Sequence, residues 1–215
     1  MPRSGVRVPP DPYFFLHGWG FSSKVLGSVP SVDLPFHGES SLDYKDFWHL
    51  ARDCALIAPK GSVLMGWSMG ASLALVMAYL FPSRFRALML VGASACFSCF
   101  WQEKNLRGFL LRLEREGEAF LREFRKIAYP KTFDDRVELY GAKVMLKDYM
   151  KLDIRRLLPH IKQRAIILHG TKDPVVPFKH ALNLYSMLKR AKLITFPGGH
   201  FPEDEGLIFK VLKSL

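Results

Sequence analysis

The sequence of 215 residues lacks an uninterrupted apolar run of the roughly 18 residues that a membrane-spanning helix needs. Its longest apolar stretch, residues 71–80, has the length of a buried helix. Residues 1–12 hold four prolines and no apolar segment of the kind found in a secretory signal peptide, so we expect a disordered lead-in there. These absences predict a soluble protein.

Cysteine is also scarce, with Cys54, Cys96 and Cys99 as the three representatives. So low and odd a number predicts no disulfide framework and favours a reducing, cytoplasmic location. Cys96 and Cys99 have a C-x-x-C spacing, but no second pair and no Cys/His partner at zinc spacing accompanies them. We therefore expect two half-buried thiols, no metal site and no cofactor.

Acidic residues are outnumbered, with 20 Asp and Glu against 31 Lys and Arg and a net charge of +11. Residues 101–164 alone carry 16 basic and 10 acidic residues. Such a surplus predicts attraction to an anionic partner, and charge alone allows a nucleic acid, a membrane surface or an acidic protein. No nucleic-acid-reading motif accompanies the charge, so we expect no nucleic acid partner.

Apolar runs that read as buried strands alternate with helical patterns along most of the chain. The expected strands are residues 13–16, 31–34, 62–67, 86–92, 165–169 and 192–196. The expected helices between and after them are residues 42–58, 69–80, 177–188 and 205–215. This alternation predicts an α/β fold with a mainly parallel sheet and helices on both of its faces.

One long segment interrupts the alternation. Residues 93–159 contain no clear strand, and helical patterns cover residues 101–116, 118–128 and 133–149. We interpret residues 95–159 as a helical lid inserted into a core made of residues 13–94 and 160–215.

The most informative motif joins a strand to a helix. Gly66-Trp67-Ser68-Met69-Gly70 has the Gly-x-Ser-x-Gly pattern of a nucleophile elbow, in which a serine hydroxyl projects from a tight turn. A Cβ atom at either glycine would collide with the neighbouring chain. The alternative is a buried serine that merely caps the helix. The strand before it and the helix after it favour Ser68 as a nucleophile.

A serine needs a base and an acid, which in this architecture follow it in the order Ser, Asp or Glu, His. Asp173 and His200 each come just after a predicted strand, so they lie at the same edge of the sheet as Ser68. Asp173 could instead cap a helix or turn, and His200 could be a surface histidine. We predict the triad Ser68, Asp173 and His200.

An oxyanion hole needs two backbone N–H groups directed at the developing negative charge. Met69 offers one at the start of its helix, and Trp19 offers the other in the turn His17-Gly18-Trp19-Gly20 after the first strand. We assign His17 a structural role in that turn.

These motifs together resemble the α/β-hydrolase superfamily: His17-Gly18-Trp19-Gly20, Asp33-Leu34-Pro35, the elbow at Ser68, Gly170-x-x-Asp173 and Gly199-His200. The HGWG turn, the Gly-Trp-Ser-x-Gly elbow, Ala95-Cys96-Phe97-Ser98 and Asp153-Ile154-Arg155 are most similar to the BioH-type carboxylesterases of biotin synthesis. The resemblance implies a serine carboxylesterase that hydrolyses pimeloyl-[acyl-carrier protein] methyl ester.

The resemblance also implies an acidic acyl carrier protein as partner and basic lid residues that bind it. The candidates are Arg107, Arg112, Arg115, Arg122, Arg125 and Lys126. A solvated helix face with internal Glu–Arg pairs is the alternative for each of them. We expect a monomer that has no membrane partner. Two other functions stay open: an esterase of small free esters, and a non-catalytic binding module.

Overall fold

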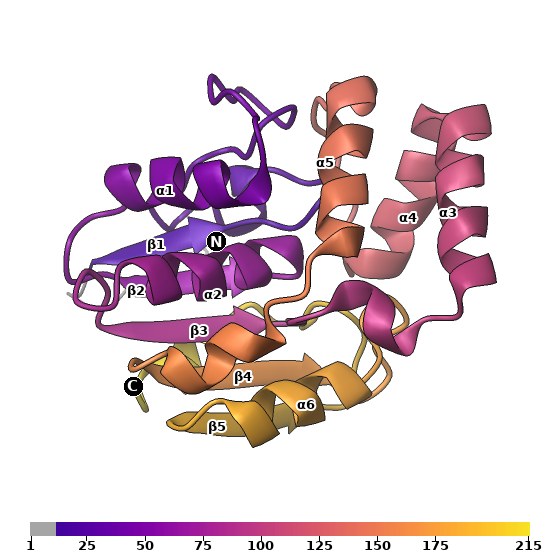
Figure 1. The fold of residues 1–215 in the computed structure, drawn as a ribbon. Helices are drawn as coiled ribbons and strands as arrows, with labels where there is room; N and C mark the ends of the chain where they lie inside the picture. Colours follow the sequence, from indigo (N-terminus) through magenta and orange to yellow (C-terminus); the bar gives the residue numbers. More distant parts are fainter. Residues whose placement is uncertain (1–11) are drawn as a thin grey trace, which may run out of the picture.

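A computed structural model describes residues 12–215 (Figure 1). Nearly all of the predicted lead-in over residues 1–12 lies outside this range. At the centre is one sheet of five strands, which are neighbours in the order of the chain. They are β1 (Tyr13–Leu16), β2 (Val63–Trp67), β3 (Ala87–Val91), β4 (Arg164–Gly170) and β5 (Ala191–Phe196). All four pairings are parallel, as predicted.

The strands run as continuous apolar segments because both faces of the sheet are covered. Successive side chains alternate between two core clusters, with Phe14 and Leu64 on one face and Phe15 and Met65 on the other. Three helices pack on the first face: α1 (Phe47–Ile57), α2 (Met69–Leu80) and α6 (Lys179–Met187). The second face is covered by the short 3-10 helix η1 (Ser23–Leu26) and α7 (Gly206–Leu212).

The segment of chain between β3 and β4, where the lid was predicted, contains three helices. They are α3 (Glu103–Glu116), α4 (Glu118–Ala128) and α5 (Leu139–Lys151), with the 3-10 helices η2 (Phe97–Phe100) before them and η3 (Arg155–His160) after them. Figure 1 shows α3, α4 and α5 beyond the carboxyl ends of the strands, the edge at which ligands bind in open parallel sheets.

Three predicted elements differ from the structure. Residues 31–34 form no strand of the sheet, because only Ser31 pairs, in an isolated bridge with Phe15. The helix predicted from residue 42 begins at Phe47, where the carboxylate of Asp46 accepts bonds from two backbone amides and caps it. Likewise, the helix predicted from residue 133 begins at Leu139 after a cap by Glu138.

Within residues 12–215, none of the helices has both the length and the apolar character required to cross a bilayer.

Candidate active site

Ser68 lies between β2 and α2 in a strained turn. Its backbone has φ 56° and ψ −121°, a conformation that L-residues rarely adopt. The two predicted close approaches are present: a Cβ on Gly66 would lie 2.4 Å from the Cα of Ala71, and one on Gly70 would lie 2.1 Å from the carbonyl oxygen of Leu16. The packing of β1, β2 and α2 therefore permits only glycine on both sides of the serine.

Asp173 and His200 are brought together from the loops that follow β4 and β5. Nδ1 of His200 donates to Oδ2 of Asp173 at 2.7 Å. The other carboxylate oxygen, Oδ1, accepts from the amides of Val175 and Val176 at 2.8 Å each. Burial raises the pKa of the Asp173 carboxyl, but His200 and these hydrogen bonds outweigh it and hold the pKa below its usual value. The pair is thus a buried carboxylate that fixes the tautomer of a histidine.

His200 and Ser68 are not joined by a hydrogen bond among the described residues, because Nε2 of His200 is buried without a partner. The indole Nε1 of Trp67, the residue before Ser68, donates to the carbonyl of His200 at 3.0 Å. With Nδ1 donating to Asp173, Nε2 carries the lone pair that a general base needs. The ring of His200 therefore lies next to Trp67, the last residue of β2, with its Nε2 free of protein partners among the described residues.

His169 is a buried neighbour of this pair that was not among the predicted site residues. Its Nε2 donates to the carbonyl of Val176 at 2.8 Å and lies 3.4 Å from Oδ2 of Asp173. Burial lowers the pKa of His169. The sequence did hold a signal for this contact, because His169 lies near the end of β4, four residues before Asp173.

The turn that carries Trp19 is held by two buried histidines. Nε2 of His17 accepts from the amide of Leu34 at 2.9 Å, which agrees with the predicted structural role. Nε2 of His37 accepts from the amide of Gly20 at 2.9 Å. Sequence reasoning missed His37, because its partner lies 17 residues away and no local pattern marks the contact.

Both histidines can accept only while they are neutral, which makes this turn sensitive to acid. Burial lowers the pKa of His17 to about 4 and that of His37 to about 3. Since the unfolded chain binds protons near pH 6.5, we expect the free energy of unfolding to fall below that pH by roughly 1.4 kcal/mol per pH unit for each histidine. Melting temperatures measured from pH 8 to pH 4.5 test this. The pH slope should decrease by roughly 1.4 kcal/mol per pH unit in His37→Gln. It should stay unchanged in His49→Gln, whose ring is half exposed.

The remaining contacts of the Trp19 turn come from the inserted helices. The indole of Trp19 donates to the carbonyl of Ala142 in α5 at 2.8 Å. Nε of Arg125 in α4 donates to the carbonyl of Gly20 at 2.7 Å. The predicted oxyanion donors, the amides of Trp19 and Met69, thus belong to two segments that the fold fixes separately.

A cavity of about 440 Å³ opens above Ser68, and Trp19, Ser68 and Met69 all line it. Most of its wall is apolar and comes from the inserted helices and η2: Phe97, Trp101, Leu106, Phe109, Phe120, Phe124, Ile127, Leu146, Tyr149 and Met150. Lys104, Arg112 and Glu123 are its charged lining residues. The cavity is therefore a largely apolar space that extends from Ser68 between the inserted helices.

The basic residues predicted to bind a partner have different surroundings. Arg125 is buried, with 4% of its surface exposed, and its guanidinium binds the carbonyls of Gly20 and Asp135, so its prediction as a docking residue is wrong. Arg112 binds Glu116 and Glu123 together and lies over Phe120.

The other candidates are exposed. Arg107 pairs with Glu103 and Arg122 with Glu118, one helical turn away in each case. Arg115 and Lys126 have no acidic group within 4 Å among the described residues.

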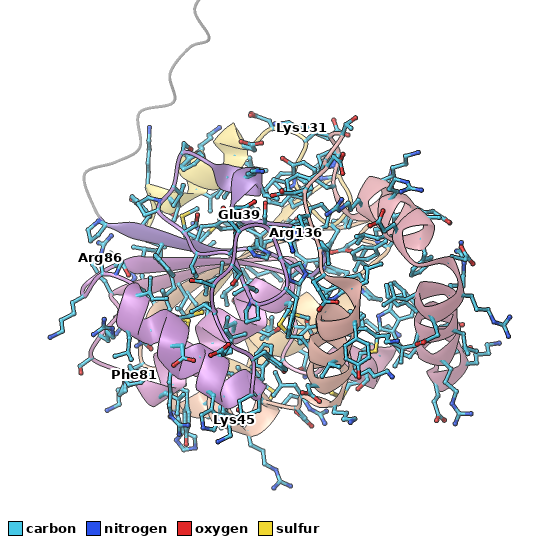
Figure 2. The ribbon with its side chains drawn as sticks, turned by 90° about the horizontal axis from the view of Figure 1, so that it is seen from above. Glu39, Lys45, Phe81, Arg86, Lys131 and Arg136 are labelled. Atoms are coloured by element: carbon cyan, nitrogen blue, oxygen red, sulfur yellow. A yellow bond between two sulfur atoms is a disulfide. The ribbon has the colours of Figure 1, made fainter. Side chains whose placement is uncertain are left out.

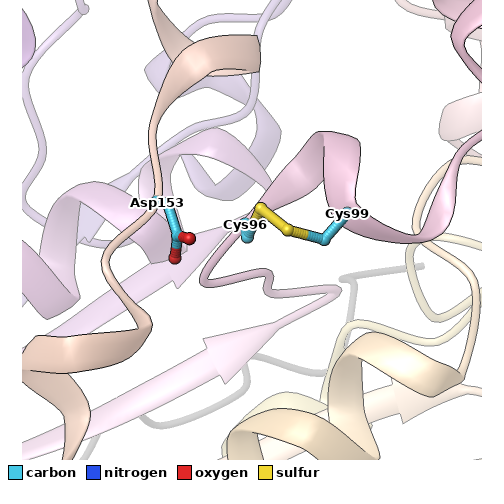
Figure 3. A group of neighbouring side chains, drawn as sticks. All are labelled: Cys96, Cys99 and Asp153. Atoms are coloured by element: carbon cyan, nitrogen blue, oxygen red, sulfur yellow. A yellow bond between two sulfur atoms is a disulfide. The ribbon is translucent and has the colours of Figure 1, made fainter.

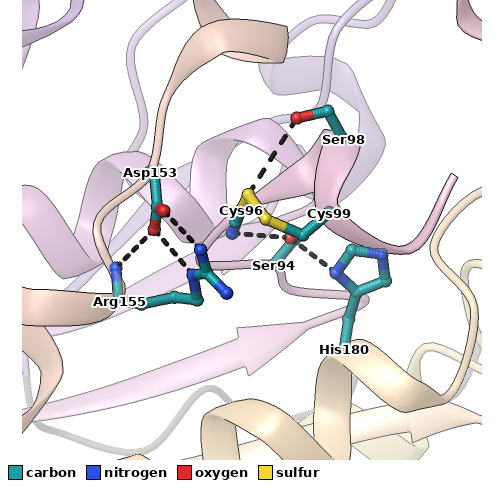
Figure 4. The surroundings of a disulfide bond; sticks show 7 residues. All are labelled: Ser94, Cys96, Ser98, Cys99, Asp153, Arg155 and His180. Carbon is teal, nitrogen blue, oxygen red and sulfur yellow. Dashed lines mark hydrogen bonds and ion pairs between the residues drawn. A yellow bond between two sulfur atoms is a disulfide. The ribbon is translucent and has the colours of Figure 1, made fainter. Parts of the chain in front are cut away.

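Cys96 and Cys99 are joined by a disulfide bond, so the prediction of two thiols is wrong (Figures 3 and 4). A C-x-x-C spacing within one turn of η2 brings the sulfurs within bonding reach. The small number of cysteines therefore no longer supports the prediction of a reducing, cytoplasmic location. The carboxylate of Asp153 lies beside the sulfurs, but it is bound by Arg155, as Figure 4 shows. A disulfide and a paired carboxylate leave this group without free metal ligands.

Comparison with known proteins gives a family and a set of relatives. The model of the alpha/beta hydrolase family matches residues 13–206. The pimeloyl-[acyl-carrier protein] methyl ester esterase of Salmonella newport is 30% identical over 200 residues, which cover 77% of this chain and 77% of that protein. The protein of the same description from Nitrosomonas europaea is 28% identical over 231 residues, with 87% of each chain covered.

Solved structures agree with the fold. An esterase from Exiguobacterium antarcticum superposes with a TM-score of 0.81 at 22% identity and covers 95% of this chain and 91% of its own. A hydrolase from Oleispira antarctica has a TM-score of 0.79 at 17% identity, with 96% and 90% covered.

Proposed function

The chain belongs to the alpha/beta hydrolase family, and from that membership we propose that it is a serine carboxylesterase with Ser68 as its nucleophile. The observation that carries the proposal is the buried Asp173–His200 hydrogen bond, which the indole of Trp67 ties to the residue before the strained Ser68. A base of fixed tautomer near a serine that lines an apolar cavity is the arrangement that acyl transfer needs.

In the proposed reaction, Nε2 of His200 takes the proton of the Ser68 hydroxyl as the oxygen attacks the ester carbonyl. The amides of Trp19 and Met69 donate to the resulting oxyanion. The C–O bond to the alcohol breaks, His200 protonates the leaving alkoxide, and an acyl-Ser68 ester remains. Water, deprotonated by His200, then hydrolyses this ester and releases the carboxylic acid and free Ser68. Asp173 stays ionised throughout and stabilises the charged imidazole.

The substrate that we propose is pimeloyl-[acyl-carrier protein] methyl ester, with methanol as the alcohol released. Two relatives of this description match most of the chain. The cavity supports the same substrate, because an aliphatic seven-carbon acyl chain fits an apolar lining and the methyl ester ends at Ser68. The acyl carrier protein would then lie outside the cavity, against the exposed basic residues of α3 and α4. A cytoplasmic location and a monomeric state stay predictions.

One observation favours a second candidate, an esterase of small free esters. Three of the predicted docking residues, Arg107, Arg112 and Arg122, already have glutamate partners within the inserted helices. Exposed pairs of this kind form a solvated surface without any partner.

Charge reversal of Arg122 and Lys126 separates the two candidates. If a carrier protein docks on α4, Arg122→Glu with Lys126→Glu should lower kcat/KM for pimeloyl-[acyl-carrier protein] methyl ester about tenfold or more, chiefly through association. Turnover of p-nitrophenyl butyrate should stay within about twofold, because that ester needs no protein contact. Both rates are measured with purified enzyme in low salt.

The matched control is Lys189→Glu with Lys192→Glu, which changes the net charge equally but at exposed sites before and in β5. Ser68→Ala checks that both activities come from the proposed nucleophile. Equal losses on the two substrates, or an enzyme that cleaves p-nitrophenyl butyrate and leaves the carrier-bound ester intact, would establish the small-ester function instead.

A further inference from the structure

The edge of the sheet opposite the candidate active site is formed by the loops that lead into the strands. Four of these loops are linked in a row by hydrogen bonds. The amide of Gly61 donates to the carbonyl of Arg84 at 2.8 Å, the side chain of Gln163 donates to the carbonyl of Pro82 at 2.8 Å, and the amide of Ala165 donates to the carbonyl of Arg190 at 3.0 Å. The loops before β2, β3, β4 and β5 therefore form one continuous surface.

This surface, which we call the basic edge, gathers most of the net charge of the protein. Its loops and the C-terminal residues beside them contain nine basic residues: Lys60, Arg84, Lys162, Arg164, Lys189, Arg190, Lys192, Lys210 and Lys213. Eight of these nine side chains are solvent-exposed, and Arg84 is half-buried. Figure 2 labels Arg86, the residue before β3, at the end of the sheet away from the inserted helices.

Acidic side chains do not balance this charge. Residues 54–102 and 206–215 contain no aspartate or glutamate, and residues 154–202 contain only Asp173, which is buried against His200. The inserted helices differ, because their arginines are interleaved with glutamates that pair with them. Within residues 12–215, none of the nine cations of the basic edge forms an ion pair with an acidic side chain. A broad surface of this kind attracts polyanions over about a Debye length, roughly 10 Å in moderate salt.

The basic edge also carries exposed aliphatic side chains. Leu56 and Ile57, at the end of α1, are 73% and 47% exposed. They lie at this edge because the guanidinium of Arg84 donates to the carbonyls of Leu56 and Ala58. Cations beside aliphatic groups favour an anionic lipid surface, where the charges contact headgroups and the aliphatic groups enter the acyl boundary. A nucleic acid, by contrast, would contact only the cationic groups through its phosphodiester backbone and would leave the aliphatic groups in water.

We infer that the basic edge is a docking surface for an anionic phospholipid membrane, which the protein binds peripherally. In this orientation β4, with seven residues of about 3.3 Å each, separates the lipid from the candidate active site. The cavity above Ser68 then faces the solution, so a dissolved ester substrate reaches it while the enzyme is bound. The inference extends beyond the proposed esterase activity and does not depend on it. It also departs from our sequence-based expectation of no membrane partner, because only the fold brings these distant loops together.

Sedimentation with vesicles tests the inference directly. We expect the full-length protein to bind vesicles of 70% phosphatidylcholine and 30% phosphatidylglycerol (roughly the anionic content of a charged leaflet) in about 50 mM salt. It should not bind pure phosphatidylcholine, and binding should weaken strongly at about 500 mM salt. The variant Lys60→Glu/Lys189→Glu/Lys192→Glu should lower the partition coefficient by about tenfold or more.

Two further variants make the result specific. Arg107→Glu/Arg115→Glu/Lys126→Glu changes the net charge equally on the inserted helices and should reduce vesicle binding much less. Leu56→Ser should reduce the binding that remains at high salt. Turnover of p-nitrophenyl butyrate and the melting temperature verify that the basic-edge variant is folded, while vesicle binding itself requires no activity.

Several results would overturn the inference. One is the absence of binding to the anionic vesicles, and another is an equal loss in the two triple variants, which would show that only the overall charge matters. A third is tighter binding to duplex DNA than to vesicles at equal phosphate concentration, with loss in the basic-edge variant, which would identify a nucleic acid as the partner.

Discussion

Replacing Asp173 by asparagine is expected to lower kcat about 10⁴-fold at neutral pH while the protein stays folded. The reason lies in the two oxygens of the carboxylate, which accept from different sides. Oδ1 accepts from the amides of Val175 and Val176, and Oδ2 accepts from Nδ1 of His200. An asparagine has a single oxygen and must place its NH₂ group on one of these sides.

The two backbone amides cannot change from donors to acceptors, so the asparagine oxygen should take the Oδ1 position. Its NH₂ group then faces His200, whose Nδ1 must become an acceptor. The proton moves to Nε2, and the nitrogen proposed to deprotonate Ser68 loses the lone pair that makes it a base. His169 adds to the conflict, because its Nε2, which donates to the carbonyl of Val176, also lies 3.4 Å from Oδ2 and offers no acceptor to an NH₂ group there.

Steady-state kinetics on p-nitrophenyl butyrate and thermal melting measure the effect. The matched control is Asp153→Asn, which removes a charge that pairs with the exposed Arg155. That variant should keep kcat within about twofold, because it lies outside the proposed triad. A folded Asp173→Asn enzyme with kcat reduced less than about tenfold would contradict the role of Asp173 as the acid of the triad.

The sequence predicts this part of the site because each residue follows a strand. Ser68, Asp173 and His200 come directly after apolar runs, and parallel strands deliver their carboxyl ends to one edge. The alternation of strands and helices also predicted the parallel pairing of the strands. The strand predicted at residues 31–34 was wrong, because only Ser31 of this segment pairs with the sheet. The carboxylate of Asp33 instead accepts hydrogen bonds from the backbone amides of Ser23 and Glu39.

Contacts between segments far apart in the sequence could not be predicted in this way. One example is His37, whose ring accepts from the amide of Gly20, 17 residues away. The Cys96–Cys99 bond is a local contact, and it was missed because the prediction rested on the number of cysteines. The basic edge is the largest case, because its charges are scattered along the chain and meet only through the fold.

Arg125 is the most instructive error, and it does have a signal in the sequence. Counting along α4, Arg125 follows Leu121 by four residues and precedes Ala128 by three, so all three share the buried face. Arg122 lies outside that set and is exposed. The family resemblance implied a partner for Arg125, whereas the helical periodicity places it in the core.

The position of Arg125 leads to the second large expected effect: Arg125→Met should lower kcat about 10²-fold with KM for p-nitrophenyl butyrate within about threefold. Nε of Arg125 donates to the carbonyl of Gly20, the residue after the proposed oxyanion donor Trp19. Without it a buried carbonyl loses its partner, and the turn relaxes away from the geometry that stabilises the oxyanion. Loss of one oxyanion donor costs about 10²–10³ in kcat.

The readout that distinguishes positioning from general destabilisation is the affinity for a boronic acid, which forms a tetrahedral adduct with the serine. We expect this affinity to fall in parallel with kcat/KM, because both report the oxyanion geometry. Arg125→Lys should recover part of the loss, since an ammonium group can still donate to Gly20. Arg122→Met, on the exposed side of the same helix, should change neither quantity. If a folded Arg125→Met enzyme keeps kcat within about threefold, the contact with Gly20 does not hold the Trp19 amide in place, and the histidines on the other side of the turn are sufficient.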